Sequence, residues 1–188
     1  MQRGLTLETV KRFRLGWNPQ SLFRPRAKWG LPEEIKENGE ARRQWLPKGI
    51  VIPSYVGDEP AKLKVRRSDW SQEDRLPKYV EISGSYQSPA IYGDVDKPFI
   101  IVESELDAML IQQEASHLVC AVALGGVSKK PNAALHRLLN RASMILLSLD
   151  FDDSGKKRNA FWMKSYAQLR PWPSPRAKSV GDAFQKSP

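Results

Sequence analysis

The chain has 188 residues, 40% hydrophobic and 27% charged, and is long enough to bury a core without disulfides or structural metal. Neither a membrane-spanning run of roughly 20 apolar residues nor a signal peptide is present, and the single cysteine, Cys120, excludes a zinc ribbon within the chain. We therefore expect a cytoplasmic protein without a membrane partner, and the net charge of +9 favours nucleic acid, although a basic protein with no such role has the same charge.

The first 97 residues are predicted to form a small, basic, mixed α+β subdomain. Eight prolines interrupt this region, so short strands and loops are expected rather than long helices. One short helix is predicted over residues 7–13, where Thr6 can cap the amino terminus. Strands are predicted over 49–53 and 61–67, and the second alternates basic with apolar residues. One face of that strand is therefore expected to be cationic.

Residues 98–188 have a different pattern, in which apolar strands alternate with helices. The predicted elements are, in chain order, a strand over 99–103, a helix over 106–115, a strand over 119–124, a helix over 132–140 and a strand over 143–149. A turn at Gly125 and Gly126 follows the second strand. Continuous apolar strands are typical of a mainly parallel sheet that is flanked by helices. The predicted fold class is α/β for this domain and α+β for the whole chain.

Acidic residues follow two of these strands where each strand ends. Glu103 ends the first strand, and Asp107 lies four residues further on. Asp150 follows the third strand, and Asp152 lies two residues later. Ligands gather at the carboxyl ends of parallel strands, where like charges about 4 Å apart repel by roughly 4 kcal/mol at an effective dielectric near 20. Oxygen ligands select Mg²⁺ or Mn²⁺, so these acids are candidate catalytic and metal-binding residues.

The acids of the third strand belong to the pattern D-x-D-x-x-G, whose glycine, Gly155, permits a tight turn beside them. An ordinary solvated turn or a helix cap is the alternative for this pattern alone. Glu103 favours the metal site, because a strand that is apolar throughout ends in this one carboxylate.

Three segments of this domain, 102–108, 123–126 and 149–155, resemble the Toprim domain of topoisomerases and primases in order and spacing. The resemblance implies a Toprim fold in which Mg²⁺ is held by the glutamate and the D-x-D aspartates. It also implies that the glycine turn brings the backbone close to the site. The residues that receive these roles by position are Glu103, Asp107, Asp150 and Asp152 as acids, and Gly125 and Gly126 at the nucleotide.

The first half resembles the catalytic core of bacterial-type primases. Residues 3–17 follow the pattern that opens that core, and segments 50–53, 63–67 and 77–79 occur in the order of its I-P strand, basic strand and K-Y motif. The resemblance implies that basic residues hold the phosphates of template and nucleotide. The candidates are Arg67 and Lys78, then Arg66, with Lys156 and Lys157 after the D-x-D pattern. An ordinary solvated cation is the alternative for each of them.

The sequence departs from the primase pattern in three places. After the K-Y motif, residues 80–84 lack the asparagine typical of cellular primases. Near the end, Ser179 stands where the closing motif has its first acid, so Asp182 is the candidate for the remaining metal-binding carboxylate. The zinc-binding module and the helicase region of primases are expected either on a longer chain or on separate partner polypeptides.

The two resemblances together imply a DNA primase core that makes short RNA primers on single-stranded DNA from nucleoside triphosphates, with Mg²⁺ or Mn²⁺ as cofactor. A Toprim nuclease, which would cleave nucleic acid with the same acids, is one alternative. A nucleic-acid-binding Toprim module without catalytic activity is the other, because a fold alone does not determine a reaction.

Overall fold

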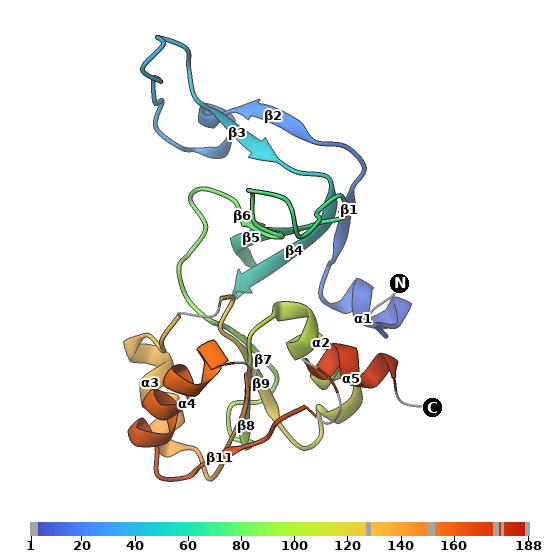
Figure 1. The fold of residues 1–188 in the computed structure, drawn as a ribbon, viewed down its shortest axis with the longest axis vertical. Helices are drawn as coiled ribbons and strands as arrows, with labels where there is room; N and C mark the ends of the chain where they lie inside the picture. Colours follow the sequence, from blue (N-terminus) through green and yellow to red (C-terminus); the bar gives the residue numbers. More distant parts are fainter. Residues whose placement is uncertain (1–3, 127–128, 150–152, 175–176, 178, 187–188) are drawn as a thin grey trace. The chain divides into compact units, whose positions relative to one another are not determined.

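The computed structural model describes residues 4–126, 129–149, 153–174, 177 and 179–186, and for 153–158 it describes the backbone alone. The chain divides into two compact units (Figure 1). The first unit is Val10–Gln87, and the second joins Met1–Thr9 to Ser88–Pro188. Both units contain strands, and helices pack on the larger sheet, which confirms the predicted α+β class.

The first unit contains a four-stranded antiparallel sheet and a separate two-stranded ribbon. The strands of the sheet, in spatial order, are β1 Gly16–Asn18, β4 Gly49–Val56, β5 Glu59–Arg67 and β6 Tyr79–Glu81. The ribbon consists of β2 Leu22–Pro25 and β3 Arg43–Leu46, with the 3-10 helix η1 Arg26–Trp29 after β2. β4 and β5 confirm the two strands predicted in this region, and both are longer than predicted.

The cations of β5 share one face of the four-stranded sheet. Side chains alternate between the two faces of a strand, so Lys62, Lys64 and Arg66 point the same way. Val65 is 1% exposed and packs on the opposite face. The predicted cationic face is confirmed, and we use that name for the face that bears Lys62, Lys64 and Arg66. Arg67 lies on the other face, with Val65.

The second unit is built on a five-stranded sheet whose pairings are parallel, except for that of the edge strand β7. In spatial order the strands are β11 Leu169–Pro171, β10 Ile145–Ser148, β8 Phe99–Val102, β9 Cys120–Ala123 and β7 Ala90–Tyr92. β8, β9 and β10 are the three predicted strands, and the mainly parallel sheet is confirmed. β7 comes from the part of the chain before residue 98 and pairs with β9.

Helices cover both faces of this sheet (Figure 1). α2 Glu105–Ala115 and α5 Val180–Gln185 lie on one side, and α3 Ala133–Arg141 and α4 Asp153–Ser165 lie on the other. All four residues of β8 are at most 2% exposed, as expected of a strand buried on both faces. The core between the sheet and the second pair of helices includes Phe99, Ile101, Val122, Leu135, Leu139, Ile145, Leu147, Trp162 and Tyr166.

The start of the helix after Thr6 agrees with the prediction from the sequence, whereas the start of α4 does not. Thr6 caps α1 Leu7–Arg12, because its Oγ1 accepts a hydrogen bond from the Thr9 amide at 3.2 Å. The predicted tight turn at Gly155 is wrong, because this residue lies inside α4, which begins at Asp153. A glycine in the first turn of a helix is tolerated when the surrounding elements pack the helix in place.

Candidate functional site

The carboxyl ends of β8 and β10 form the edge of the sheet from which the predicted acids follow. These strands are parallel neighbours, and Val102 pairs with Ser148. Glu103 therefore leaves β8 at the level at which Leu149 leaves β10. Glu103 is partly buried, and Leu149 is 3% exposed. The two segments that lead to the predicted acids thus reach one edge of the sheet, where α/β proteins bind ligands.

The metal-binding prediction rests partly on residues that the structure does not describe. Asp150 and Asp152 lie outside the described residues, as do the side chains of Lys156 and Lys157 near the start of α4. Within the described residues, no group of three or more His, Cys, Asp or Glu side chains is arranged to hold a metal ion. The donor chemistry fits Mg²⁺ nonetheless, because Glu103 supplies a carboxylate at this edge and the segment after β10 carries only carboxylates as candidate ligands.

Gly125 brings the backbone that follows β9 against Glu103. Its amide donates a hydrogen bond to the Glu103 carbonyl oxygen at 2.9 Å. Its φ of 76° lies in the left-handed region that favours glycine. The predicted turn at Gly125 and Gly126 is therefore beside the candidate acid, and the role of these glycines at a nucleotide stays a prediction.

Asp107 joins the start of α2 to the start of α5. Its side chain is buried, with only 5% of the residue exposed. Oδ2 accepts a hydrogen bond from the Ser104 hydroxyl at 2.7 Å, and Oδ1 accepts one from the Gly181 amide at 3.0 Å. Ser104 in turn caps α2 by accepting a hydrogen bond from the Asp107 amide at 3.1 Å. Asp107 thus has a structural role in addition to the catalytic one predicted for it.

Ser179, which stands where the primase closing motif has an acid, caps α5. Its Oγ accepts a hydrogen bond from the Asp182 amide at 3.3 Å. Serine and aspartate are about equally favourable as caps, so the serine preserves the local structure. Asp182 is partly exposed in the first turn of α5, where a negative charge is favourable. A metal contact by Asp182 stays a prediction.

Cys120 has no nucleophilic role. The residue is fully buried in β9, and its Sγ donates a hydrogen bond to the Tyr92 carbonyl oxygen at 3.3 Å. Burial raises the pKa of the thiol to about 12. The thiol is therefore protonated at neutral pH and unreactive.

The cationic face of the first unit is a separate candidate for binding phosphate. Lys62 and Lys64 are 4% and 3% exposed, and Arg66 is partly exposed. Arg66 takes part in no ion pair between described residues, and its Nε is buried there without a hydrogen-bond partner. Because Arg66 is partly exposed and forms no ion pair between described residues, its charge is available to an external acceptor such as a phosphate. The two lysines were not among the predicted site residues, although the alternation that predicted the face includes them.

Arg67 organises the loop of residues 68–78. Its Nε donates a hydrogen bond to Asp69 and its Nη2 donates one to Asp74, both at 3.1 Å. The guanidinium also lies over the Trp45 ring, 5.6 Å from the ring centroid. The Arg67 amide closes the loop by donating to the Lys78 carbonyl oxygen at 2.9 Å. Arg67 therefore has a structural role, and the phosphate contact predicted for it stays a prediction.

Lys78 is held by a ring of the same loop. Its Nζ lies 5.0 Å from the centroid of the Trp70 ring, which is a cation–π contact. Trp70 Nε1 donates a hydrogen bond to the Leu76 carbonyl oxygen at 3.1 Å, which fixes the ring within the loop. The loop that Arg67 folds therefore also determines where the Lys78 ammonium lies.

We expect Arg67→Ala to lower the free energy of unfolding by about 2–3 kcal/mol, because two carboxylates lose their partner and the Trp45 ring loses its contact. Urea unfolding of the full chain measures this change. Arg66→Ala is the matched control and is expected to cost less than about 1 kcal/mol, since Arg66 forms no such bonds with other described residues. Equal losses in the two variants would show that the loop contacts of Arg67 contribute nothing measurable.

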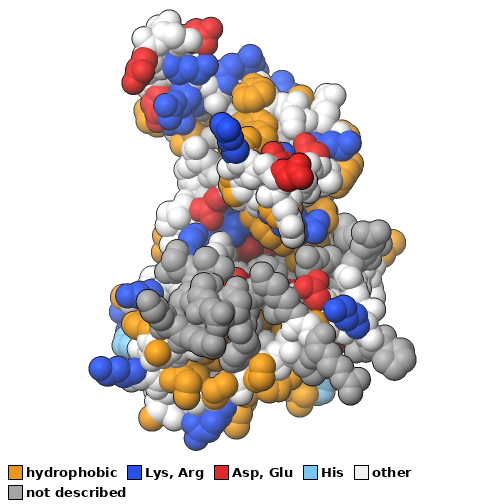
Figure 2. All heavy atoms as spheres, in the orientation of Figure 1, with side chains coloured by type: hydrophobic (Ala, Val, Ile, Leu, Met, Phe, Trp, Pro, Cys, Tyr) orange, Lys and Arg blue, Asp and Glu red, His pale blue; other side chains and the backbone are white. Residues whose placement is uncertain are grey.

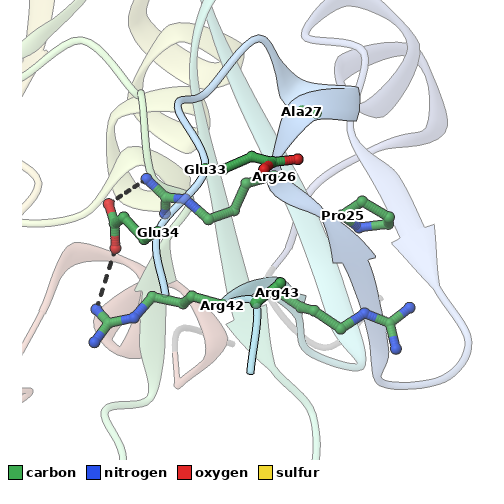
Figure 3. Close-up of a pocket in the computed structure, with 8 residues that line it drawn as sticks. Pro25, Arg26, Ala27, Glu33, Glu34, Arg42 and Arg43 are labelled. Atoms are coloured by element: carbon green, nitrogen blue, oxygen red, sulfur yellow. Dashed lines mark hydrogen bonds and ion pairs between the residues drawn. The ribbon is translucent and has the colours of Figure 1, made fainter. Parts of the chain in front are cut away.

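A cavity of about 220 Å³ lies at the end of the ribbon, where η1 and the loop that leads to β3 meet (Figure 3). Its charged lining residues are Arg26, Arg42, Arg43, Glu33 and Glu34. Glu34 bridges two of the arginines, pairing with Arg26 through a short hydrogen bond and with Arg42 at 3.5 Å. Figure 2 shows Lys and Arg side chains gathered over this ribbon, with acidic side chains toward the tip of its loop. Because its own acids offset much of the arginine charge, we assign the cavity to the folding of the ribbon.

Several solved structures that resemble this chain are primase catalytic cores. The RNA polymerase domain of the Mycobacterium tuberculosis primase DnaG aligns with a TM-score of 0.68 and 18% identity, over 98% of this chain and 69% of that one. The E. coli primase catalytic core aligns with a TM-score of 0.67 and 18% identity, over 98% of this chain and 66% of that one. A DnaG primase catalytic domain bound to single-stranded DNA aligns with a TM-score of 0.68 and 19% identity, over 99% of this chain and 67% of that one.

The chain thus spans about two thirds of the length of these three cores. No protein-family model matches the sequence, and no curated protein matches it significantly. In the part of the chain that the structure describes, no helix has the length and apolar character required to cross a membrane. The likeness confirms the resemblance on which the predicted fold rested: over nearly its whole length, the chain has the fold of the catalytic, RNA polymerase core of DnaG primases.

Proposed function

We propose that this protein is the catalytic core of a DNA primase, which synthesises short RNA primers on single-stranded DNA by Mg²⁺-dependent nucleotidyl transfer. The observation that supports the proposal is a primase-core fold over 98–99% of the chain, with Glu103 at the carboxyl end of β8. One of the similar structures is a primase catalytic domain bound to single-stranded DNA, which supports the same ligand for this chain.

In this proposal Glu103, Asp150 and Asp152 hold Mg²⁺, and Asp182 supplies a further carboxylate. The bound metal would stabilise negative charge on the phosphates of the incoming nucleotide. Glu103 is well suited to the task, because a fully buried strand and the Gly125 amide hold its backbone. Asp107 contributes by fixing the start of α5, the helix that carries Asp182.

The proposed phosphate-binding residues are Arg66 and Lys78, together with Lys156 and Lys157. Arg66 supports the proposal because it is partly exposed and takes part in no ion pair between described residues. Lys78 supports it because the Trp70 ring holds the ammonium in place while leaving it cationic. Each phosphate that these cations neutralise would release counterions, so binding to DNA should weaken as salt concentration rises. A zinc-binding module and a replicative helicase are proposed partners, on separate chains or in a longer protein.

The test is an incubation of the full chain with a single-stranded DNA template, four ribonucleoside triphosphates of which one is labelled, and Mg²⁺. Denaturing gels are expected to show short labelled RNA, which disappears when the template is omitted or EDTA is added. A degraded template would indicate a nuclease instead. A template that is bound in a gel-shift assay, with neither synthesis nor degradation, would indicate a binding module. Either of these results would overturn the primase proposal.

A further inference from the structure

One row of residues crosses the cationic face from edge to edge. The strand register pairs Trp17 of β1 with Ile50 of β4, Ile50 with Arg66 of β5, and Arg66 with Tyr79 of β6. Residues that pair directly across strands share a face. Because neighbouring strands are about 4.8 Å apart, Trp17 and Arg66 lie roughly 10 Å from each other on that face. We call these four residues the Trp17 row.

Residues of the Trp17 row are exposed to solvent on the cationic face, whereas the neighbouring cross-strand pair on the same face is buried. Ile52 and Lys64, which form the next pair, are 0% and 3% exposed. Trp17 is 55% exposed, and Ile50 and Arg66 are both partly exposed. A ligand that reaches this face therefore has access to the Trp17 row first.

The Trp17 indole is displayed on a backbone that is held in place. At 55% exposure, much of the Trp17 side chain is accessible to a ligand. β1 pairs with β4, and the Asn18 Nδ2 donates hydrogen bonds to the Leu46 and Pro47 carbonyl oxygens at 3.2 and 2.8 Å. The strand that carries the indole is thus fixed both to the sheet and to the chain segment after β3.

A sheet face that bears an exposed aromatic ring beside a cation suits single-stranded nucleic acid. Bases stack on the ring, and the backbone phosphates meet the cation. The Trp17 row offers both groups within the reach of one or two nucleotides, since the long Arg66 side chain extends from a position roughly 10 Å away. The partial exposure of Arg66, which forms no ion pair between described residues, is the second observation that favours a phosphate from a ligand.

We propose that Trp17 is a base-stacking residue for the single-stranded DNA template and that Arg66 binds a phosphate beside the stacked base. This assignment rests on the proposed primase function and adds to it the residue that orients the template on the cationic face. Stacking tolerates every base, so Trp17 strengthens binding without selecting a sequence.

The test measures binding of a fluorescent oligothymidylate to the full chain by anisotropy, in EDTA so that no synthesis occurs. Trp17→Ala is expected to weaken binding roughly 5- to 100-fold, whereas Trp17→Phe, which keeps a ring, should stay within about threefold of the unaltered chain. Trp29→Ala is the matched control, because Trp29 is a 38% exposed tryptophan on η1, outside the cationic face, and its loss should leave affinity unchanged. Equal affinities of the Trp17→Ala and Trp29→Ala variants would overturn the assignment.

Salt dependence separates the roles of the two residues. Arg66→Gln is expected to reduce the slope of log Kd against log salt by about 0.7, the contribution of one phosphate contact on a single strand. Trp17→Ala should weaken binding with the slope unchanged, because stacking releases no counterion. An altered slope in Trp17→Ala would mean that the variant disturbs the cations, and would count against stacking.

Photo-cross-linking tests the stacking role of Trp17 on the unaltered chain, so the result does not depend on whether the Trp17→Ala variant folds. An oligonucleotide that carries 5-iodouracil is expected to cross-link to Trp17, as identified by mass spectrometry of the peptides. Cross-links confined to other residues would refute the stacking role while leaving the primase proposal intact. Absence of both primer synthesis and DNA binding in the unaltered chain would refute the primase proposal itself.

Discussion

Replacing Glu103 by Gln is expected to lower Mg²⁺-dependent primer synthesis at least about 100-fold, because a ligand that neutralises the metal loses its charge. The substitution keeps the size of the side chain. Its backbone should stay in place, since β8 is buried on both faces and the Gly125 amide binds the Glu103 carbonyl oxygen rather than its carboxylate. Affinity for single-stranded DNA should stay within about twofold, because no cation is removed. Incorporation of labelled ribonucleotides measures the rate, and anisotropy measures the affinity.

The matched control for this experiment is Glu114→Gln. Glu114 is exposed in the last turn of α2, at the end of the helix opposite the one that follows Glu103. This variant should make primers at the normal rate. The double variant Asp150→Asn/Asp152→Asn should lose synthesis as Glu103→Gln does, and partial activity in Glu103→Gln should require a higher Mg²⁺ concentration. Normal synthesis by Glu103→Gln at low Mg²⁺ would contradict its assignment as a metal ligand.

The parallel sheet could be predicted from the sequence because its central strands carry a local signal. β8 and β9 are apolar at every position, and each is buried throughout. This pattern is typical of strands that are covered on both faces. The edge strands β7 and β11 have three residues each, too few for a pattern, and they become strands only through pairing with β9 and β10.

Glu103 could be located by the same reasoning, but the contacts of Asp107 could not. Glu103 was predicted at the edge of the sheet because it ends an apolar strand, and the structure places it there. The Gly181 amide that binds Asp107 lies 74 residues further along the chain, so no local pattern indicates the contact. Glu105 is another such case, because its 1% exposure in the first turn of α2 has no signal in the sequence.

Strand register explains why Arg66 and Arg67 have different surroundings. The two residues are adjacent in β5, so they lie on opposite faces, and the choice of face depends on pairing with β4 and β6. The resemblance to primases favoured Arg67 slightly, whereas the structure commits the Arg67 side chain to Asp69 and Asp74. Trp17 is similar, because its place on the cationic face follows only from its pairing with Ile50.

Replacing Asp107 by Ala is expected to lower the free energy of unfolding by at least about 3 kcal/mol. Hydrogen bonds to a charged group contribute about 1.5–3 kcal/mol each, and the substitution leaves the Gly181 amide and the Ser104 hydroxyl without this acceptor. The loss of a negative charge in the first turn of α2 adds about 0.3–1 kcal/mol. Asp107→Asn keeps one acceptor oxygen and should lose about half as much. Denaturant unfolding of the full chain measures both variants.

Amide hydrogen exchange can localise this effect. If Asp107 holds the start of α5, the Gly181 amide should exchange faster in Asp107→Ala, because its acceptor is gone, while amides in the buried strand β9 exchange faster only as far as global stability falls. Glu114→Ala, an exposed acid on the same helix, is the control and should change neither quantity. The structural role would be contradicted if Asp107→Ala kept the stability of the chain and the protection of the Gly181 amide but lost primer synthesis. That result would mean that the Asp107 carboxylate acts in catalysis and that its hydrogen bonds are dispensable for the fold.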